Sequence, residues 1–159
     1  MPQDISGYDV GALLYCPANA HHTVAQAVAA ERLPRPFSLA LCLEDTVRAD
    51  TLAAAEQAVE QTLHDLTDAA RQETFYRPLT FVRVRSPEQL ARLGRAYGKY
   101  RPLLTGFILP KFFIETCGTY CAVIRDLQAD GLDYFYMPVF EAPSMLPLHT
   151  RHAALAEVK

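Results

Sequence analysis

Runs of apolar residues alternate with amphipathic stretches along the whole chain. Short apolar runs predict five β-strands, at residues 11–15, 38–43, 79–84, 106–109 and 133–140. The run at 38–43 is apolar without a break, which is typical of a strand buried on both faces of a parallel sheet. Helices are expected between these strands, over residues 22–33, 51–72, 86 onwards and 114–127, with a short helical stretch at 152–158.

Local signals support two of these helices in particular. The stretch 51–72 repeats apolar residues at intervals of three and four, which places them on one helical stripe: Leu52, Ala55, Val59, Leu63 and Leu66. Ser86 precedes Pro87, so the serine hydroxyl can cap a helix whose first turn accepts proline.

Strands that alternate with helices predict an α/β fold with about five parallel strands and right-handed crossovers. The 159 residues are expected to form a single α/β domain, because the chain contains no linker or low-complexity segment. Two architectures fit this pattern. One is an open doubly wound sheet, and the other is a series of consecutive βα units from a partial (β/α)8 TIM barrel.

Composition excludes several classes of protein. The net charge is −3 with acidic and basic residues interspersed, so neither nucleic acid nor a membrane surface is an expected partner. Asp4 and Asp9 stand where a secretion signal needs positive charge, and no apolar stretch is long enough to span a bilayer. Together with four cysteines expected as free thiols, this favours a cytoplasmic protein. No glycine-rich phosphate-binding motif is present, which disfavours a dinucleotide or ATP site.

Charged residues recur where the predicted strands end. Glu44 and Asp45 follow the second strand, Arg83 lies at the end of the third, Lys111 follows the fourth and Glu141 follows the fifth. Parallel α/β folds bind their ligands at the carboxyl ends of strands, so these side chains are candidates for one site. Arg83 is the most informative, because an unpaired charge within an apolar strand is costly.

Five segments resemble, in order, the strand motifs of the citrate lyase β-subunit and HpcH/HpaI aldolase family. They are LLYCPAN (13–19), LALCLEDTV (39–47), FVRVR (81–85), GFILPKF (106–112) and YMPVFEAP (136–143). The resemblance implies the N-terminal βα units of a TIM barrel. A complete barrel has eight such units, so about three C-terminal units are expected to be absent from this sequence. LLYCPAN (13–19) is also similar to the opening segment of TIM-barrel carbon–carbon bond lyases found with tellurium-resistance and stress-response genes.

The resemblance also implies a chemistry. The family cleaves or forms a carbon–carbon bond next to a carbonyl with the help of Mg²⁺, which stabilises an enolate. Glu141 would be a metal ligand, and Arg83 would bind a substrate oxygen or carboxylate. Glu44 and Asp45 would serve in proton transfer or hold a metal-bound water, and Lys111 would hold the strand end and contact substrate. The expected substrate is a hydroxy or keto acid, in some members as a coenzyme A thioester.

Departures from the family pattern are compatible with an alternative function. Cys42 stands where the family has an aspartate, Asp45 where the aldolase branch has a histidine, and Arg85 where it has an asparagine, which adds positive charge near the site. The family's second metal-binding aspartate would fall beyond Glu141, outside this sequence. The alternative is therefore a non-catalytic or truncated α/β subunit that acts in assembly. On either interpretation, a homo-oligomer or a second chain that completes the barrel is expected, since five strands leave two open edges.

Overall fold

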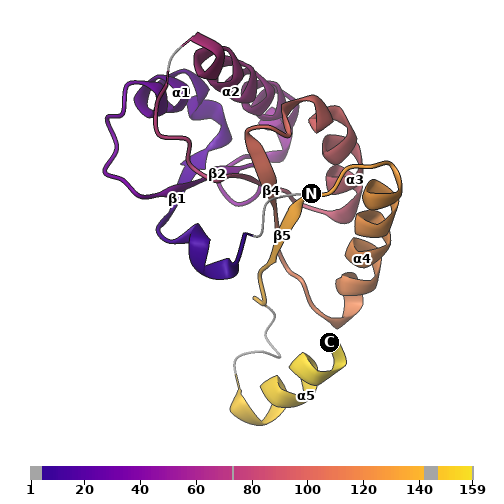
Figure 1. The fold of residues 1–159 in the computed structure, drawn as a ribbon. Coiled ribbons are helices and arrows are strands. Elements are labelled where there is room, and N and C mark those ends of the chain that lie inside the picture. Colours follow the sequence, from indigo (N-terminus) through magenta and orange to yellow (C-terminus); the bar gives the residue numbers. More distant parts are fainter. Residues whose placement is uncertain (1–4, 73, 142–146, 159) are drawn as a thin grey trace.

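The structure, a computed structural model, describes residues 5–72, 74–141 and 147–158, so Asp4 and the end of the fifth motif at 142–143 lie outside the described residues. Strands and helices alternate along the chain (Figure 1). The strands are β1 (Leu13–Pro17), β2 (Ser38–Cys42), β3 (Thr80–Arg83), β4 (Leu104–Leu109) and β5 (Phe135–Pro138). The helices are α1 (His21–Ala29), α2 (Leu52–Gln72), α3 (Pro87–Ala96), α4 (Ile114–Ala129) and α5 (Leu148–Val158).

The order of the strands decides between the two predicted architectures. The five strands form one sheet in the order β1-β2-β3-β4-β5, and every neighbouring pair is parallel. A doubly wound sheet reverses its strand order at a switch point. This sheet has no such reversal in the part of the chain described, so each βα unit adds the next strand on the same side, as in a barrel. The fold is a partial α/β TIM barrel, which confirms the predicted class.

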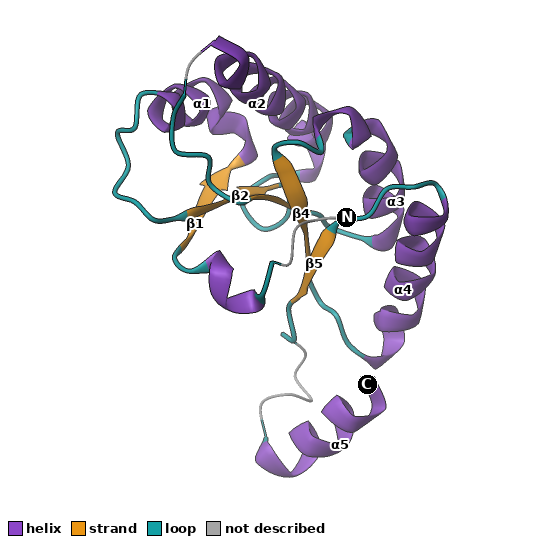
Figure 2. Ribbon diagram, viewed as in Figure 1, coloured by secondary structure: helices purple, strands orange, loops and turns teal. Residues whose placement is uncertain are grey.

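The two faces of the sheet are packed differently, and helices α1 to α4 cover only the outer one (Figure 2). Side chains of alternate strand residues, such as Leu41, Val82 and Phe107, pack against these helices in the larger apolar cluster. The intervening residues Ala40, Phe81 and Ile108 point to the inner face, which would line the interior of a barrel.

Gly106 allows β4 and β5 to approach each other. A β-carbon added to Gly106 would lie 1.7 Å from the backbone oxygen of Phe135, its partner in the register. No side chain can occupy that space, so glycine is required by the spacing of these two strands.

Most of the predicted elements are present, with boundaries shifted by a few residues. Ser86 caps α3, where its hydroxyl accepts a hydrogen bond from the Gln89 backbone amide at 3.3 Å. Helix α1 ends earlier than expected, because Glu31 adopts a left-handed conformation with φ of 50°. Helix α5 begins at Leu148 rather than 152, and it contacts the rest of the molecule through Ala154, which packs against Phe113. Among the described helices, none is both long and apolar enough to cross a membrane.

Candidate active site

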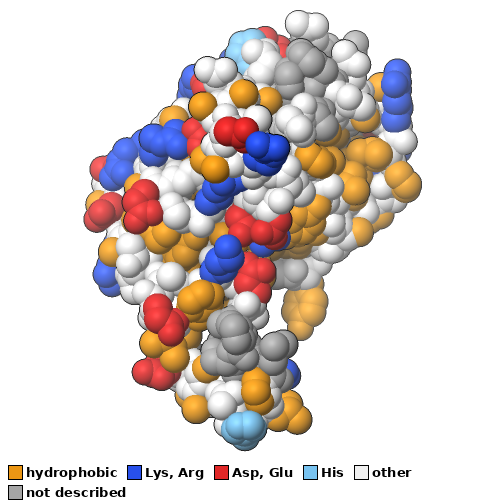
Figure 3. All heavy atoms as spheres, turned by 180° about the vertical axis from the view of Figure 1, so that it is seen from behind, with side chains coloured by type: hydrophobic (Ala, Val, Ile, Leu, Met, Phe, Trp, Pro, Cys, Tyr) orange, Lys and Arg blue, Asp and Glu red, His pale blue; other side chains and the backbone are white. Residues whose placement is uncertain are grey.

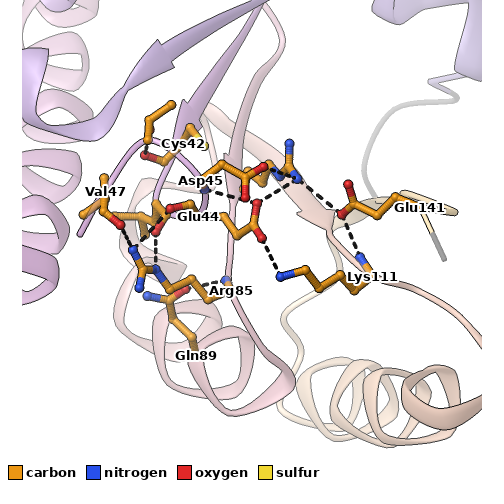
Figure 4. Close-up of polar contacts among 11 residues, drawn as sticks. Cys42, Glu44, Asp45, Val47, Arg85, Gln89, Lys111 and Glu141 are labelled. Carbon is orange, nitrogen blue, oxygen red and sulfur yellow. Dashed lines mark hydrogen bonds and ion pairs between the residues drawn. The ribbon is translucent and has the colours of Figure 1, made fainter. Parts of the chain in front are cut away.

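The carboxyl ends of four strands bring the five predicted site residues together. Glu44 and Asp45 lie in the loop after β2, Arg83 ends β3, Lys111 lies in the turn after β4 and Glu141 follows β5. Figure 4 shows the three carboxylates turned toward one point, with Lys111 beside them. Residues separated by as many as 97 positions in the sequence thus meet because consecutive parallel strands end on the same edge of the sheet.

Arg83 is the centre of this cluster. Its Nη2 lies 2.8 Å from Glu44 Oε2, 3.2 Å from Asp45 Oδ2 and 3.3 Å from Glu141 Oε1. The Arg83 side chain is only 12% exposed, and Glu44 is 7% exposed. The guanidinium carbon of Arg83 also lies 5.9 Å from the centre of the Tyr15 ring. Among the described residues, Arg83 Nε is buried without a hydrogen-bond partner.

The ion pairs keep both Arg83 and Lys111 in their protonated forms. Burial alone would lower the pKa of Arg83, but Glu44, Glu141 and Asp45 outweigh burial, so the pKa is raised above its ordinary value. The Lys111 Nζ lies 3.1 Å from Glu44 Oε1, and this hydrogen bond raises the pKa of Lys111. Lys111 is therefore protonated at neutral pH, which makes it a poor nucleophile.

The Lys111 backbone helps to place Glu141. Lys111 has a φ of 51°, an unusual conformation for a residue with a side chain, and its backbone N–H donates to Glu141 Oε1 at 3.0 Å. Left-handed backbone costs about 1 kcal/mol or more in a residue other than glycine, so the surrounding contacts must hold this turn in place.

The structure places Arg85 and Cys42, two of the departures from the family pattern. Arg85 was expected to add positive charge near the site, and its guanidinium lies next to it, where it donates to backbone carbonyls of the β2–α2 loop, including Leu43 at 2.6 Å. Cys42 is 1% exposed and is paired with Arg83 in the sheet register, so this buried thiol lies beside the cluster. The loop-holding role of Arg85 was missed, because the direction of a side chain just past a strand end depends on the loop.

The donor chemistry of the cluster fits a hard cation such as Mg²⁺, which prefers carboxylate oxygens. Arg83 Nη2, however, occupies the point on which the carboxylates converge. Accordingly, the described residues include no group of three His, Cys, Asp or Glu side chains arranged to hold a metal. Asp45 and Glu141, with side chains 67% and 35% exposed, are the carboxylates that could hold an ion without first breaking the buried Arg83–Glu44 pair.

A row of charged residues on the carboxyl edge of a barrel-type sheet is the arrangement found in TIM-barrel enzymes. The chain belongs to the family described as C–C bond lyases of the TIM-barrel fold, whose family model matches residues 4–159. That match covers nearly the whole chain and supports lyase function in general terms. No curated protein matches the chain.

Proposed function

We propose that the chain acts on a carbon–carbon bond next to a carbonyl, in a hydroxy acid or its coenzyme A thioester, as a lyase of the citrate lyase and HpcH/HpaI aldolase type. The observation that carries this proposal is the position of Arg83. A buried guanidinium at a strand end is costly to maintain, and its Nε is a buried donor without a hydrogen-bond partner among the described residues, which is unusual outside functional sites.

The proposed reaction needs a cationic group at the oxygen where negative charge develops. Cleavage breaks the bond between the carbinol carbon and its neighbour, and the electron pair moves toward the carbonyl to form an enolate. Arg83 would bind the substrate carboxylate or carbonyl oxygen with its planar fork and offset that charge. Lys111, protonated and 60% exposed, would contact a second oxygen of the substrate.

The two neighbouring carboxylates are suited to different tasks. Both oxygens of Glu44 are occupied, since Oε1 pairs with Lys111 and Oε2 pairs with Arg83 and accepts from the Asp45 backbone amide at 3.1 Å. Glu44 would therefore hold the two cations in place. Asp45 is 67% exposed, so it is the better placed to accept the hydroxyl proton of a substrate and to return a proton to the enolate carbon.

Mg²⁺ would be held by Glu141 and by substrate oxygens, and when bound it would act as a Lewis acid toward the enolate. The residues of the chain would bind and orient the acid around it. The edges of the described sheet are β1 and β5, whereas a closed barrel of this type has eight strands. We therefore also propose that further βα units pair with these edges. A purely assembly-related role without catalysis remains the competing function, and the two free edges favour it.

Titration calorimetry tests the proposal directly. Purified protein is titrated with Mg²⁺ in the presence and absence of oxaloacetate or pyruvate, beside Glu141→Ala and the control Glu157→Ala on α5. Saturable binding of Mg²⁺ that the keto acid tightens, and that only Glu141→Ala abolishes, supports a lyase site. Absence of binding in all three proteins contradicts the catalytic proposal for this chain and favours the assembly role.

A further inference from the structure

Arg85 links two segments that are about 40 residues apart in the sequence. Its Nε donates to the Leu43 carbonyl at 2.6 Å, and its Nη2 donates to the Glu44 carbonyl at 3.2 Å and to the Val47 carbonyl. All three acceptors belong to the loop between β2 and α2, which carries Glu44 and Asp45 (Figure 4). Hydrogen bonds from a charged donor are stronger than neutral ones, so this one side chain is a strong attachment for the loop.

The other end of this attachment is itself held rigidly. The Arg85 backbone N–H donates to Gln89 Oε1 at 2.7 Å, and Gln89 Nε2 donates to Glu56 Oε1 on α2 at 2.6 Å. Gln89 is 6% exposed, so these bonds are protected from water. Glu56 Oε1 also pairs with Arg92 at 2.6 Å. Arg85 therefore extends from a fixed framework formed by α2 and α3.

Apart from Arg85, one backbone bond ties the start of the loop to β3, from the Leu43 amide to the Arg83 carbonyl at 3.0 Å. The other hydrogen bonds that involve backbone groups of the described loop residues are short-range ones within it or to the end of β2, such as those from the Val47 amide to the Glu44 carbonyl at 3.2 Å and from the Thr46 hydroxyl to the Cys42 carbonyl at 3.3 Å. Arg85 binds the carbonyl of Glu44 itself, and the Glu44 side chain then reaches both Arg83 and Lys111. The position of the Glu44 backbone consequently determines whether its carboxylate can contact both cations.

We propose that Arg85 is a positioning residue for the active site: it fixes the β2–α2 loop so that Glu44 bridges Arg83 and Lys111 and Asp45 faces the same point. Because an arginine keeps its charge at all physiological pH values, the attachment is permanent rather than switched by pH. The ordering of the loop stands on the contacts alone, whereas its effect on substrate binding rests on the proposed lyase function.

Hydrogen exchange measures the ordering of the loop without any substrate. The proteins compared are the wild type, Arg85→Ala, Arg85→Lys and Arg101→Ala. Arg101 is a matched control, since it donates to the Gly131 and Asp133 carbonyls at 2.8 and 3.1 Å and lies at the opposite edge of the sheet. We expect Arg85→Ala to raise exchange of the Asp45 and Val47 amides about tenfold or more, because charged hydrogen bonds to the loop are lost.

The pattern across variants separates positioning from general destabilisation. Arg85→Lys, which keeps one donor group and the charge, should give an intermediate rate, and it also serves if Arg85→Ala does not fold. Arg101→Ala should leave the loop amides unchanged. Unchanged loop exchange in both Arg85 variants, or an equal rise in β3 and α2, would overturn the inference.

A binding measurement then distinguishes this inference from the proposed function. Oxaloacetate affinity should fall about tenfold in Arg85→Ala and stay constant in Arg101→Ala, since a misplaced Glu44 no longer supports Arg83. If the wild type binds no keto acid while loop exchange still depends on Arg85, the proposed function fails and the positioning role stands. If oxaloacetate binds equally well to Arg85→Ala, the loop does not position the site.

Discussion

Arg101, near the amino ends of the strands, and Arg83, at their carboxyl ends, use their guanidinium groups for different purposes. At the amino edge, Arg101 donates to the Gly131 and Asp133 carbonyls and lies 5.8 Å from the centre of the Tyr134 ring, next to an open cavity of about 510 Å³. At the carboxyl edge, Arg83 contacts three carboxylates and no backbone carbonyl in the described part of the chain. Arginine at the amino edge satisfies backbone groups, which folding requires. The cluster around Arg83 instead brings three carboxylates and two cations together, and groups of interacting charges of this kind are candidates for function.

Charge on the rest of the surface is mixed rather than concentrated. Figure 3 shows acidic and basic side chains interspersed on the face seen from behind. Exposed pairs elsewhere, such as Arg95 with Asp130, whose atoms lie 2.8 Å apart, have side chains that are about half exposed. Pairs of this type contribute little to stability, which sets the buried Arg83–Glu44 pair apart from them.

Arg83→Lys gives the largest expected effect. A lysine keeps the positive charge but loses the planar fork, so lyase activity should fall about 100-fold or more, as when one charge-stabilising donor is removed from an active site. Steady-state cleavage of the best substrate found for the wild type measures this, with Arg101→Lys at the amino edge as the control. Equal losses in the two variants would remove the distinction between the edges.

Glu44→Gln should reduce stability next. Glu44 is 7% exposed and pairs with both Arg83 and Lys111, so its neutralisation leaves Arg83 buried with fewer compensating charges. Breaking this pair should lower the free energy of unfolding by about 2 kcal/mol, less than for an isolated buried pair because Asp45 and Glu141 remain. Urea denaturation provides the measurement. The exposed Glu60, paired with Lys99 at 2.6 Å, gives the control Glu60→Gln, in which no measurable change is expected.

Tyr134, near the amino ends of the strands, should make the free energy of unfolding depend on pH under alkaline conditions. Burial raises the pKa of Tyr134 to about 12, and its hydroxyl donates to the Gly94 carbonyl at 2.7 Å. A raised folded-state pKa means that this stabilisation is complete below pH 10 and is lost as the pH rises through 12, at most about 3 kcal/mol in all. Tyr134→Phe should therefore flatten the pH dependence of unfolding in that window. A curve as steep as that of the wild type would assign the loss to other tyrosines.

Arg83→Met should have the smallest and most specific effect, an increase in Mg²⁺ affinity. Arg83 Nη2 occupies the point on which Glu44, Asp45 and Glu141 converge, so its removal frees their oxygens for a cation. We expect binding about tenfold tighter by calorimetry, which corresponds to one modest ion-pair contribution. Weaker binding in Arg83→Met would show instead that Arg83 and the ion act together.

The positions of the strands and helices could be predicted well from the sequence, but which strands pair with one another could not. Apolar runs and the Ser86–Pro87 cap are local signals, and they place the strands and α3 within a few residues. The choice between a barrel and a doubly wound sheet depends on which strands pair. That choice is non-local, and the family resemblance rather than hydrophobic periodicity favoured the barrel. Because parallel strands end on the same side of the sheet, the sequence correctly predicted that Glu44, Arg83, Lys111 and Glu141 lie together. The roles of these residues stay predictions.

Side-chain direction in loops could not be predicted in the same way. Arg83 and Arg85 lie two residues apart and look equivalent in the sequence, yet one contacts carboxylates and the other backbone carbonyls. The difference arises because β3 ends at Arg83, so alternation along the strand no longer governs Arg85. The left-handed turn at Lys111 likewise has no sequence signal, since it depends on Glu141 accepting the Lys111 amide.

The contact between Gly106 and Phe135 restricts the evolution of the sheet. Because a methyl group alone would overlap a backbone oxygen, no single substitution at this position can be accommodated by repacking a side chain. Substitution of Gly106 during evolution would require the backbone of β5 to move as well, and the chain runs directly from β5 to Glu141. Lineages that keep the acidic residue in register with Arg83 should therefore keep the glycine, and loss of the glycine in a relative would mark a site that has already been rebuilt.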